Sequence, residues 1–213
     1  MNNTVNLIIR LAVISIVAGG SICAQTVTIE PMPNNTEFDD FAPSITNHGK
    51  VIIYSTDRSG KGQRLMSMEQ TNGAWSASRP LSGDVNDSEH SGVGALTPDG
   101  QSMIFSSTNH DVQGSGRTDL YMARKRNGSW RDVTSLGSSV NSASYDAQPS
   151  LSSDGRTLYF VSDRPGGQGA SDIYTSTWDG SEWSIAIPVA GVNSPSGEMS
   201  PVIAPDGRTL YFA

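Results

Sequence analysis

The segment SDGRTLYFVSDR, residues 153–164, carries the main structural signal of this 213-residue chain. Asp154-Gly155 stands between two apolar runs, which is a strong hairpin signal because Gly tolerates positive φ and the Asp side chain can bond nearby backbone. The run Thr157–Ser162 is almost continuously β-branched or aromatic. Such a run is typical of a strand that is covered on both faces. The segment therefore predicts a tight turn that leads into a buried strand.

The same segment recurs along the chain. PDGQSMIFSS at 98–107 and PDGRTLYF at 205–212 repeat it, and a degenerate first copy lies at 47–49. Gly49, Gly100, Gly155 and Gly207 are 51, 55 and 52 residues apart. Two further markers keep this register, namely Trp75, Trp130 and Trp183, and Asn35, Asn86, Asn141 and Asn193. A period of this size indicates stacked or radially arranged units.

Each repeat has room for four short strands. In the third repeat we expect strands at 148–152, 157–162, 172–177 and 182–187, and no segment of the chain shows a helical stripe of ten or more residues. A sandwich would not need the same turn four times in one register, and a β-helix has a much shorter period. The sequence predicts an all-β fold, a β-propeller of four-stranded antiparallel blades. We expect three complete blades at roughly 41–83, 92–139 and 147–191, and a partial fourth at 200–213.

These residues resemble the WD-repeat-like propeller repeat of TolB-type proteins. The likeness rests on residues 153–164 with Asp172-Ile173-Tyr174 behind them, and on the copies at 98–107 and 205–212. The first copy departs from it, with His48 in place of Asp and Arg64 in place of the Asp that opens the third strand. The resemblance implies an interaction platform of the bacterial envelope. Some such proteins carry an OmpA-like peptidoglycan-binding domain, and related propellers gate serine peptidases.

Residues 1–24 have the layout of a secretory signal peptide. Arg10 precedes the apolar run 11–18, and small residues lead to Cys23-Ala24. The run is too short for a membrane span. Lipidation of Cys23 stays open as an alternative, although Ile22 stands where a lipoprotein signal wants a small residue. We expect a protein exported across the inner membrane that is periplasmic or associated with the outer membrane.

Both ends of the repeat array suggest a larger ring. Residues 26–31 stand where the last strand of a preceding blade would be, so they are expected to close the ring. Closure in this way would leave the last blade without its third strand. We therefore expect the natural protein to continue after Ala213, and to associate with the outer membrane or peptidoglycan through that continuation.

The charge of the chain argues against nucleic acid as a partner. The formal net charge is −7 with a pI near 4.8, and Arg124-Lys125-Arg126 is the one basic cluster that stands out. Phosphate binding needs a concentrated basic face. The expected partners are an envelope protein, a peptide or a glycan.

The candidate binding residues lie in two kinds of loop that share one face of a propeller. They follow the second strands or join successive blades, and they are Asp40, Asp57, Arg58, Glu89, His90, His110, Asp146, Asp163, Arg164 and Glu198. Polar groups on loops of a rigid scaffold are common binding sites, which predicts a mostly acidic recognition surface. The alternative is that these residues brace the blades, since Asp163-Arg164 repeats as Asp57-Arg58.

No catalytic, metal or cofactor site is expected. The chain has no Gly-x-Ser-x-Gly or His-Glu-x-x-His motif, and His48, His90 and His110 lack the spacing of metal ligands. The loop Gly166–Gly169 with Asp163 and Asp172 lacks the dense acidic ligands of a Ca²⁺ loop. A carboxylate pair across the channel would be the one route to glycoside hydrolysis.

The sequence thus predicts a secreted propeller that binds protein, peptide or glycan and is not an enzyme. The alternative is the non-catalytic propeller of a larger peptidase or glycosidase.

Overall fold

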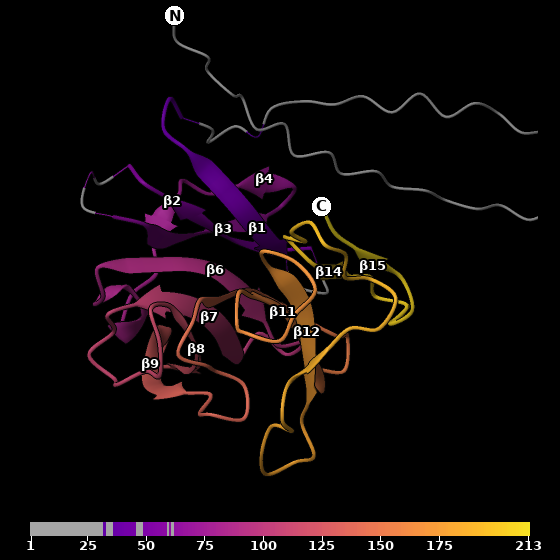
Figure 1. Ribbon diagram of the computed structural model, residues 1–213. Helices are drawn as coiled ribbons and strands as arrows, with labels where there is room; N and C mark the ends of the chain where they lie inside the picture. The colour runs from indigo at the N-terminus through magenta and orange to yellow at the C-terminus, as the bar shows by residue number, and fades with distance from the viewer. Residues whose placement is uncertain (1–31, 33–35, 46–48, 59, 61) are drawn as a thin grey trace, which may run out of the picture.

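The computed structural model describes residues 32, 36–45, 49–58, 60 and 62–213 (Figure 1). The predicted signal peptide and the predicted closing strand at 26–31 lie outside the described residues. One short 3-10 turn, Asp84–Asn86, accompanies an otherwise all-β structure in this part of the chain.

Successive segments of the chain form four antiparallel sheets, which we call the first to fourth blades. The first blade contains β1 (Asp40–Ile45), β2 (Val51–Thr56), β3 (Arg64–Thr71), β4 (Ala74–Trp75) and β5 (Arg79–Pro80). The second contains β6 (His90–Leu96), β7 (Ser102–Thr108), β8 (Asp119–Arg126) and β9 (Ser129–Ser135). The third contains β10 (Asp146–Leu151), β11 (Thr157–Ser162), β12 (Asp172–Thr177) and β13 (Ile187–Pro188). The fourth contains β14 (Val202–Ile203) and β15 (Leu210–Tyr211). The predicted four-stranded antiparallel blades are confirmed.

The blades fan out from their first strands. β1 lies against β6, β6 against β10, and β10 against β14, while the later strands of each blade point outward (Figure 1). Among the described residues, no strand pairing joins β14 or β15 back to β1, so the sheets do not close into a ring.

The hydrophobic core lies between the faces of neighbouring blades. Met103 and Phe105 of β7 pack with Ile53 and Leu65 of the first blade, whereas Ile104 belongs to the cluster shared with the third blade. Alternate residues of a strand point to opposite faces, and both faces of β7 are covered. This packing explains why the second strands are almost continuously apolar.

β1, β6, β10 and the segment just before β14 each contain an irregular residue at the same place in the repeat. Ala42, Val93, Gln148 and Ser200 have φ angles of 51°, 38°, 55° and 54°, and the pairing of β1, β6 and β10 with their neighbours shifts register there. The bulge frees a backbone N–H for the adjacent blade. Val93 N donates to Ser55 Oγ at 2.7 Å, and Ser200 N donates to Gln148 Oε1 at 2.7 Å.

The repeated asparagines hold the third strand of each blade. Asn141 Oδ1 accepts from Leu120 N at 2.9 Å, and its Nδ2 donates to Leu120 O at 2.9 Å. Asn86 makes the same two bonds to Leu65, and Asn193 makes them to Ile173. The asparagine spacing found in the sequence therefore reflects one backbone clamp that is used three times.

The fourth strand of the third blade differs from the prediction. We expected a strand at 182–187, but β13 covers only Ile187–Pro188, and a single bridge pairs Trp178 with Trp183. The Asp179 carboxylate accepts from Ser181 N at 2.7 Å and Glu182 N at 2.9 Å, which bends the chain before a ladder can form. The tryptophans still act as apolar anchors, because Trp130 and Trp183 are buried and Trp75 is half-buried.

Candidate functional site

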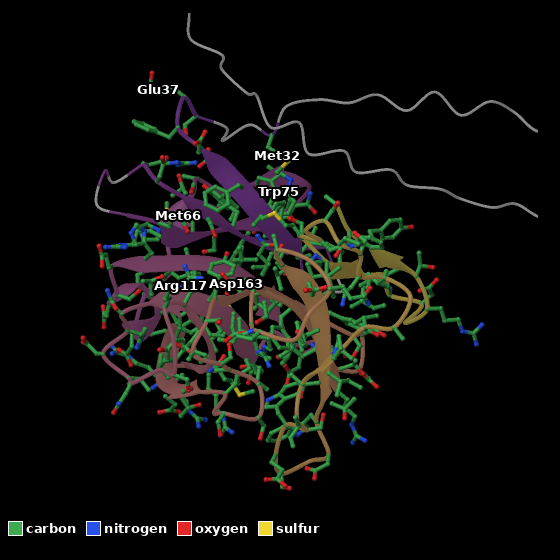
Figure 2. The ribbon with its side chains drawn as sticks, in the orientation of Figure 1. Met32, Glu37, Met66, Trp75, Arg117 and Asp163 are labelled. Carbon is green, nitrogen blue, oxygen red and sulfur yellow. The ribbon has the colours of Figure 1, made fainter. Side chains whose placement is uncertain are left out.

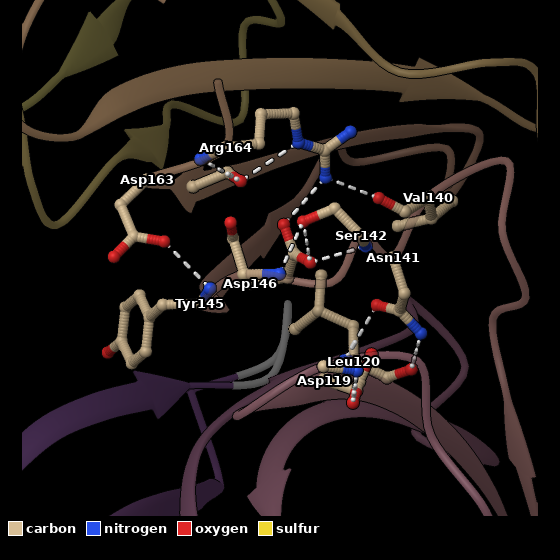
Figure 3. A network of polar contacts seen from close by, with 12 residues as sticks. Asp119, Leu120, Val140, Asn141, Ser142, Tyr145, Asp146, Asp163 and Arg164 are labelled. Carbon is tan, nitrogen blue, oxygen red and sulfur yellow. Dashed lines mark hydrogen bonds and ion pairs between the residues drawn. The ribbon is translucent and has the colours of Figure 1, made fainter.

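Asp146 and Arg164 form an ion pair inside the third blade (Figure 3). Arg164 Nη2 lies 2.6 Å from Asp146 Oδ1 and donates to Val140 O at 2.6 Å. The guanidinium also covers the ring of Tyr174, at 4.7 Å from its centroid. The other Asp146 oxygen accepts from Ser142 N and Oγ, and the side chain is fully buried. The carboxylate and the guanidinium are therefore both bound to other groups of the fold.

The first blade repeats this pair, and the second replaces both members. Arg58 donates to Asp40 Oδ1 at 2.9 Å and lies over Tyr54, at 5.6 Å from the ring centroid. In the second blade Ser91 stands at the carboxylate position and Asn109 at the arginine position. The ring of the next residue, His110, takes the place of the guanidinium beside the aromatic pair, with ring centroids 6.0 Å from Phe105 and 5.0 Å from Tyr121. His110 is buried, with Nε2 3.2 Å from Asp84 O and Nδ1 accepting from Val112 N at 3.1 Å.

Asp57 and Asp163 tie the loop after the second strand to the segment before the first strand. Asp163 Oδ1 accepts from Tyr145 N at 2.8 Å, and Asp57 Oδ1 accepts from Asp39 N at 3.2 Å. Arg117 of the second blade also pairs with Asp163 (Figure 2). Burial opposes ionisation of Asp163, but these bonds outweigh it and hold its pKa below the usual value.

The remaining predicted residues have different surroundings. Glu89 is exposed and accepts from Asn109 Nδ2 at 3.0 Å. His90 is partly exposed, and its Nδ1 accepts from Gln63 N at 3.2 Å. Glu198 is buried and accepts from the N–H and the hydroxyl of Ser194. The ten predicted residues thus do not form one continuous acidic ring, since Asp40, Asp146 and Glu198 are turned into the blades.

The glycine-rich loops fold back onto the carboxylate that opens the third strand. Asp172 accepts from Gln168 N at 3.0 Å and Gly169 N at 3.3 Å, and Asp119 accepts from Ser115 N and Gly116 N. Burial raises the pKa of Asp119 despite these bonds. The backbone therefore uses the oxygens that a cation would need. No group of three His, Cys, Asp or Glu side chains with metal-site geometry occurs in the described part of the chain.

The last glycine of each loop contacts the next blade. A Cβ on Gly116 would lie 2.4 Å from Ser144 O, and one on Gly169 would lie 1.5 Å from Ser196 O. Arg117 N and Ala170 N donate to these same carbonyl oxygens at 3.1 and 3.0 Å. A Cβ on Gly62 would lie 2.2 Å from Glu89 O. Glycine is required at these positions because two backbones meet there.

A cavity of about 930 Å³ lies between the first strands of the four blades. Its lining comes mainly from β1, β6, β10, β14 and the turns that follow them, and includes aliphatic side chains such as Ile45, Val93 and Val202. Among the described residues, no Asp, Glu, Lys or Arg lines this cavity. Its titratable side chains are His90 and Tyr145, and burial followed by the nearby Asp163 charge raises the pKa of Tyr145. The wall suits an uncharged, largely apolar ligand.

The sequence prediction found one residue of this cavity, His90. The signal that could have found the rest is a proline at the same place in three repeats, Pro43 in β1, Pro149 in β10 and Pro201 just before β14. These prolines lie three residues after the half-buried Asp40 and the buried Asp146 and Glu198. Pro lacks the backbone N–H needed for a ladder, so it indicates an irregular inner strand.

Among the described residues, no helix is long and apolar enough to cross a membrane.

Comparison with known proteins identifies the fold. No family model matches the sequence, and no curated protein sequence matches it either. Among solved structures, a putative TolB from Agrobacterium tumefaciens superposes with a TM-score of 0.60 at 20% identity, over 89% of this chain and 59% of that one. TolB from Acinetobacter baumannii gives 0.52 at 23% identity, over 79% of this chain and 36% of that one. An alpha-L-arabinofuranosidase from Lactobacillus brevis gives 0.56 at 14% identity, over 81% of this chain and 64% of that one. At these identities the likeness concerns the fold alone, and the chain spans about a third to three fifths of the TolB structures. The four sheets are thus blades of a β-propeller like those of TolB-type proteins.

Proposed function

We propose that this chain is a secreted binding scaffold that holds an uncharged, mainly apolar peptide segment in the cavity between its first strands. The observation that carries this proposal is the wall of the cavity: the described residues that line it include no Asp, Glu, Lys or Arg, although the chain as a whole has a net charge of −7. A volume of about 930 Å³ falls within the range of ordinary ligand sites.

The same wall argues for a peptide rather than other ligands. A nucleic acid or another anion needs basic groups, and glycoside hydrolysis needs two carboxyl groups at the reacting bond. Uncharged side chains of the kind found here favour apolar contacts with a few hydrogen bonds from His90, Tyr145 or Gln148. The absence of charged groups from the wall also supports a role without catalysis. The exposed loop residues Glu89 and Asp57 stay predicted contacts for a ligand that extends beyond the cavity.

The proposed location is the bacterial envelope. It is supported by the signal-peptide pattern of residues 1–24 and by the fold shared with the TolB structures. Association with the outer membrane or peptidoglycan is part of this proposal.

A second candidate is the propeller part of a larger hydrolase. It is supported by the likeness to a puromycin-hydrolyzing peptidase from Mycobacterium tuberculosis, with a TM-score of 0.52 at 18% identity over 80% of this chain and 26% of that one. A hydrolase domain encoded in the same reading frame would favour this candidate, and further propeller repeats would favour the scaffold.

The experiment is a binding screen of the 213-residue chain against synthetic decapeptides with blocked ends, in matched uncharged and charged panels. We expect uncharged apolar peptides to bind, and Ile45→Asp or Val202→Asp to weaken them at least about tenfold, because each places a carboxylate on an apolar wall. Ile185→Asp is the matched control, since Ile185 is 76% exposed and lies outside the cavity. Preferential binding of charged peptides, or equal loss in all three variants, would contradict the proposal.

A further inference from the structure

Val93 has an unusual backbone conformation for a β-branched residue. Its φ angle is 38°, in the left-handed region, where a β-branched side chain is sterically strained. It is the bulged residue of β6, because the pairing of β6 with β7 shifts register between Gly92 and Gly94. The residues at this place in the other repeats are not β-branched, and they are Ala42, Gln148 and Ser200. The second blade therefore carries more steric strain at its bulge than the other blades.

The contacts of the bulge do not explain the valine. Val93 N donates to Ser55 Oγ at 2.7 Å, and this bond to the first blade uses the backbone alone. The two neighbouring glycines lack a side chain for reasons of space. A Cβ on Gly92 would lie 2.8 Å from Gln63 Oε1, and one on Gly94 would lie 2.8 Å from Met103 Sδ. The chain thus has glycine where neighbouring side chains approach closely and valine where the backbone is strained.

The Val93 side chain serves the cavity wall rather than the core. It lines the cavity and is half-buried, and the three apolar clusters of the described chain do not include it. β6 lies between β1 and β10, which belong to sheets of five and four strands. Bulges often re-aim a side chain beside a functional site, and strained residues persist at such sites when the surrounding structure holds them.

We propose that Val93 is a specificity-determining residue of the cavity, an inference that rests on the peptide site proposed above. Its isopropyl group narrows the wall where β6 faces the ligand, so that the peptide places a small apolar residue there. The chain keeps a strained residue at position 93 because the ligand contacts it. Differences of one methylene group in an apolar pocket change discrimination by about 10- to 200-fold.

Urea denaturation tests the strain without any ligand. Val93→Asn should raise the midpoint by about 0.5 M, because asparagine adopts the left-handed conformation more readily than valine. Val133→Asn is the matched control, since Val133 is half-buried against the core of the first two blades and has no positive φ angle. It should lower the midpoint, because it buries an amide among apolar groups. An unchanged or lower midpoint for Val93→Asn overturns the proposal.

Calorimetric titration of the 213-residue chain tests the specificity. The probes are decapeptides with blocked ends in which serine alternates with one apolar residue, Ala, Val, Leu or Phe. We expect wild type to bind the valine peptide more tightly than the phenylalanine peptide. Val93→Ala should shift the ratio of the two dissociation constants about tenfold in favour of phenylalanine, and Val133→Ala should leave it unchanged. Circular dichroism checks that each variant is folded.

The outcomes separate this inference from the peptide site itself. If wild type binds the peptides but prefers phenylalanine, or if Val93→Ala keeps the wild-type ratio, the role of Val93 is overturned and the peptide site stands. If wild type binds none of the peptides, both are overturned.

Discussion

Asp146 and Arg164 illustrate how charged residues in this protein serve the fold. The carboxylate is fully buried, and the guanidinium is held between it, the carbonyl of Val140 and the ring of Tyr174. Removal of one member of such a pair leaves a buried charge without its counter-charge. The strength of the pair is therefore best measured through stability.

Arg164→Gln should lower the free energy of unfolding by about 3–5 kcal/mol, because Asp146 would remain buried without a cation. Arg156→Gln is the control, since Arg156 is an exposed turn residue, and it should stay within about 0.5 kcal/mol of wild type. Urea denaturation measures both values. Equal stability of the two variants would show that the buried pair contributes nothing specific.

The turn aspartates make stability depend on pH. The Ser152 hydroxyl and then Arg156 N lower the pKa of Asp154, and Arg208 N and then Thr209 N lower the pKa of Asp206. A carboxyl whose pKa is lower in the folded state adds stability above its unfolded pKa of about 3.9 and loses it as pH falls through the folded value. Thermal unfolding from pH 6 to 2.5 should show Tm falling below about pH 4. The double variant Asp154→Asn, Asp206→Asn should fall less steeply, and an identical slope would contradict this assignment.

The glycine-rich loops before the third strands connect neighbouring blades. The last glycines of two loops, Gly116 and Gly169, lie against backbone carbonyl oxygens of the segment that leads to the next blade. The backbone N–H of the residue after each glycine donates a hydrogen bond to the same oxygen. The third strand, its preceding loop and the following blade therefore form one connected unit. Any side chain at the last glycine must push two backbones apart.

Gly116→Ala should destabilise the protein by about 1–3 kcal/mol, the usual cost of overpacking. The nearest oxygen, Ser144 O, would lie 2.4 Å from the new Cβ. Ser115→Ala is the matched neighbour, because that side chain is exposed, and it should be close to neutral. Urea denaturation again gives the comparison, and proteolysis near residues 142–145 should accelerate in the glycine variant alone.

Strands and site residues differ in how far the sequence could predict them. β11 and β12 match the predicted 157–162 and 172–177, because Asp-Gly turns and continuous apolar runs specify them locally. The predicted fourth strand of the third blade was wrong, since a side-chain turn at Asp179 competes with the ladder. The Asp146–Arg164 pair depends on the register of β10 with β11. The two residues are 18 positions apart in the sequence, and the sequence alone does not give this register.

At the scale of the whole molecule, the cavity has no counterpart in any one segment. Its wall comes from four first strands that are about 50 residues apart in the chain and that meet only when the blades pack face to face. Side-chain contacts such as Ser200 N to Gln148 Oε1 fix these strands relative to one another. The Asp, Glu, Lys and Arg side chains of the described residues lie outside the wall, so the cavity is less charged than the acidic chain around it.

Hydrogen exchange of the 213-residue chain, with and without the tightest-binding uncharged decapeptide, tests the central claim most directly. The account predicts slower exchange at backbone amides of β1, β6, β10 and β14, including Val93 and Gln148, which line the cavity. Protection confined to the loops around Asp57-Arg58 and Asp163-Arg164, with unchanged first strands, would contradict it.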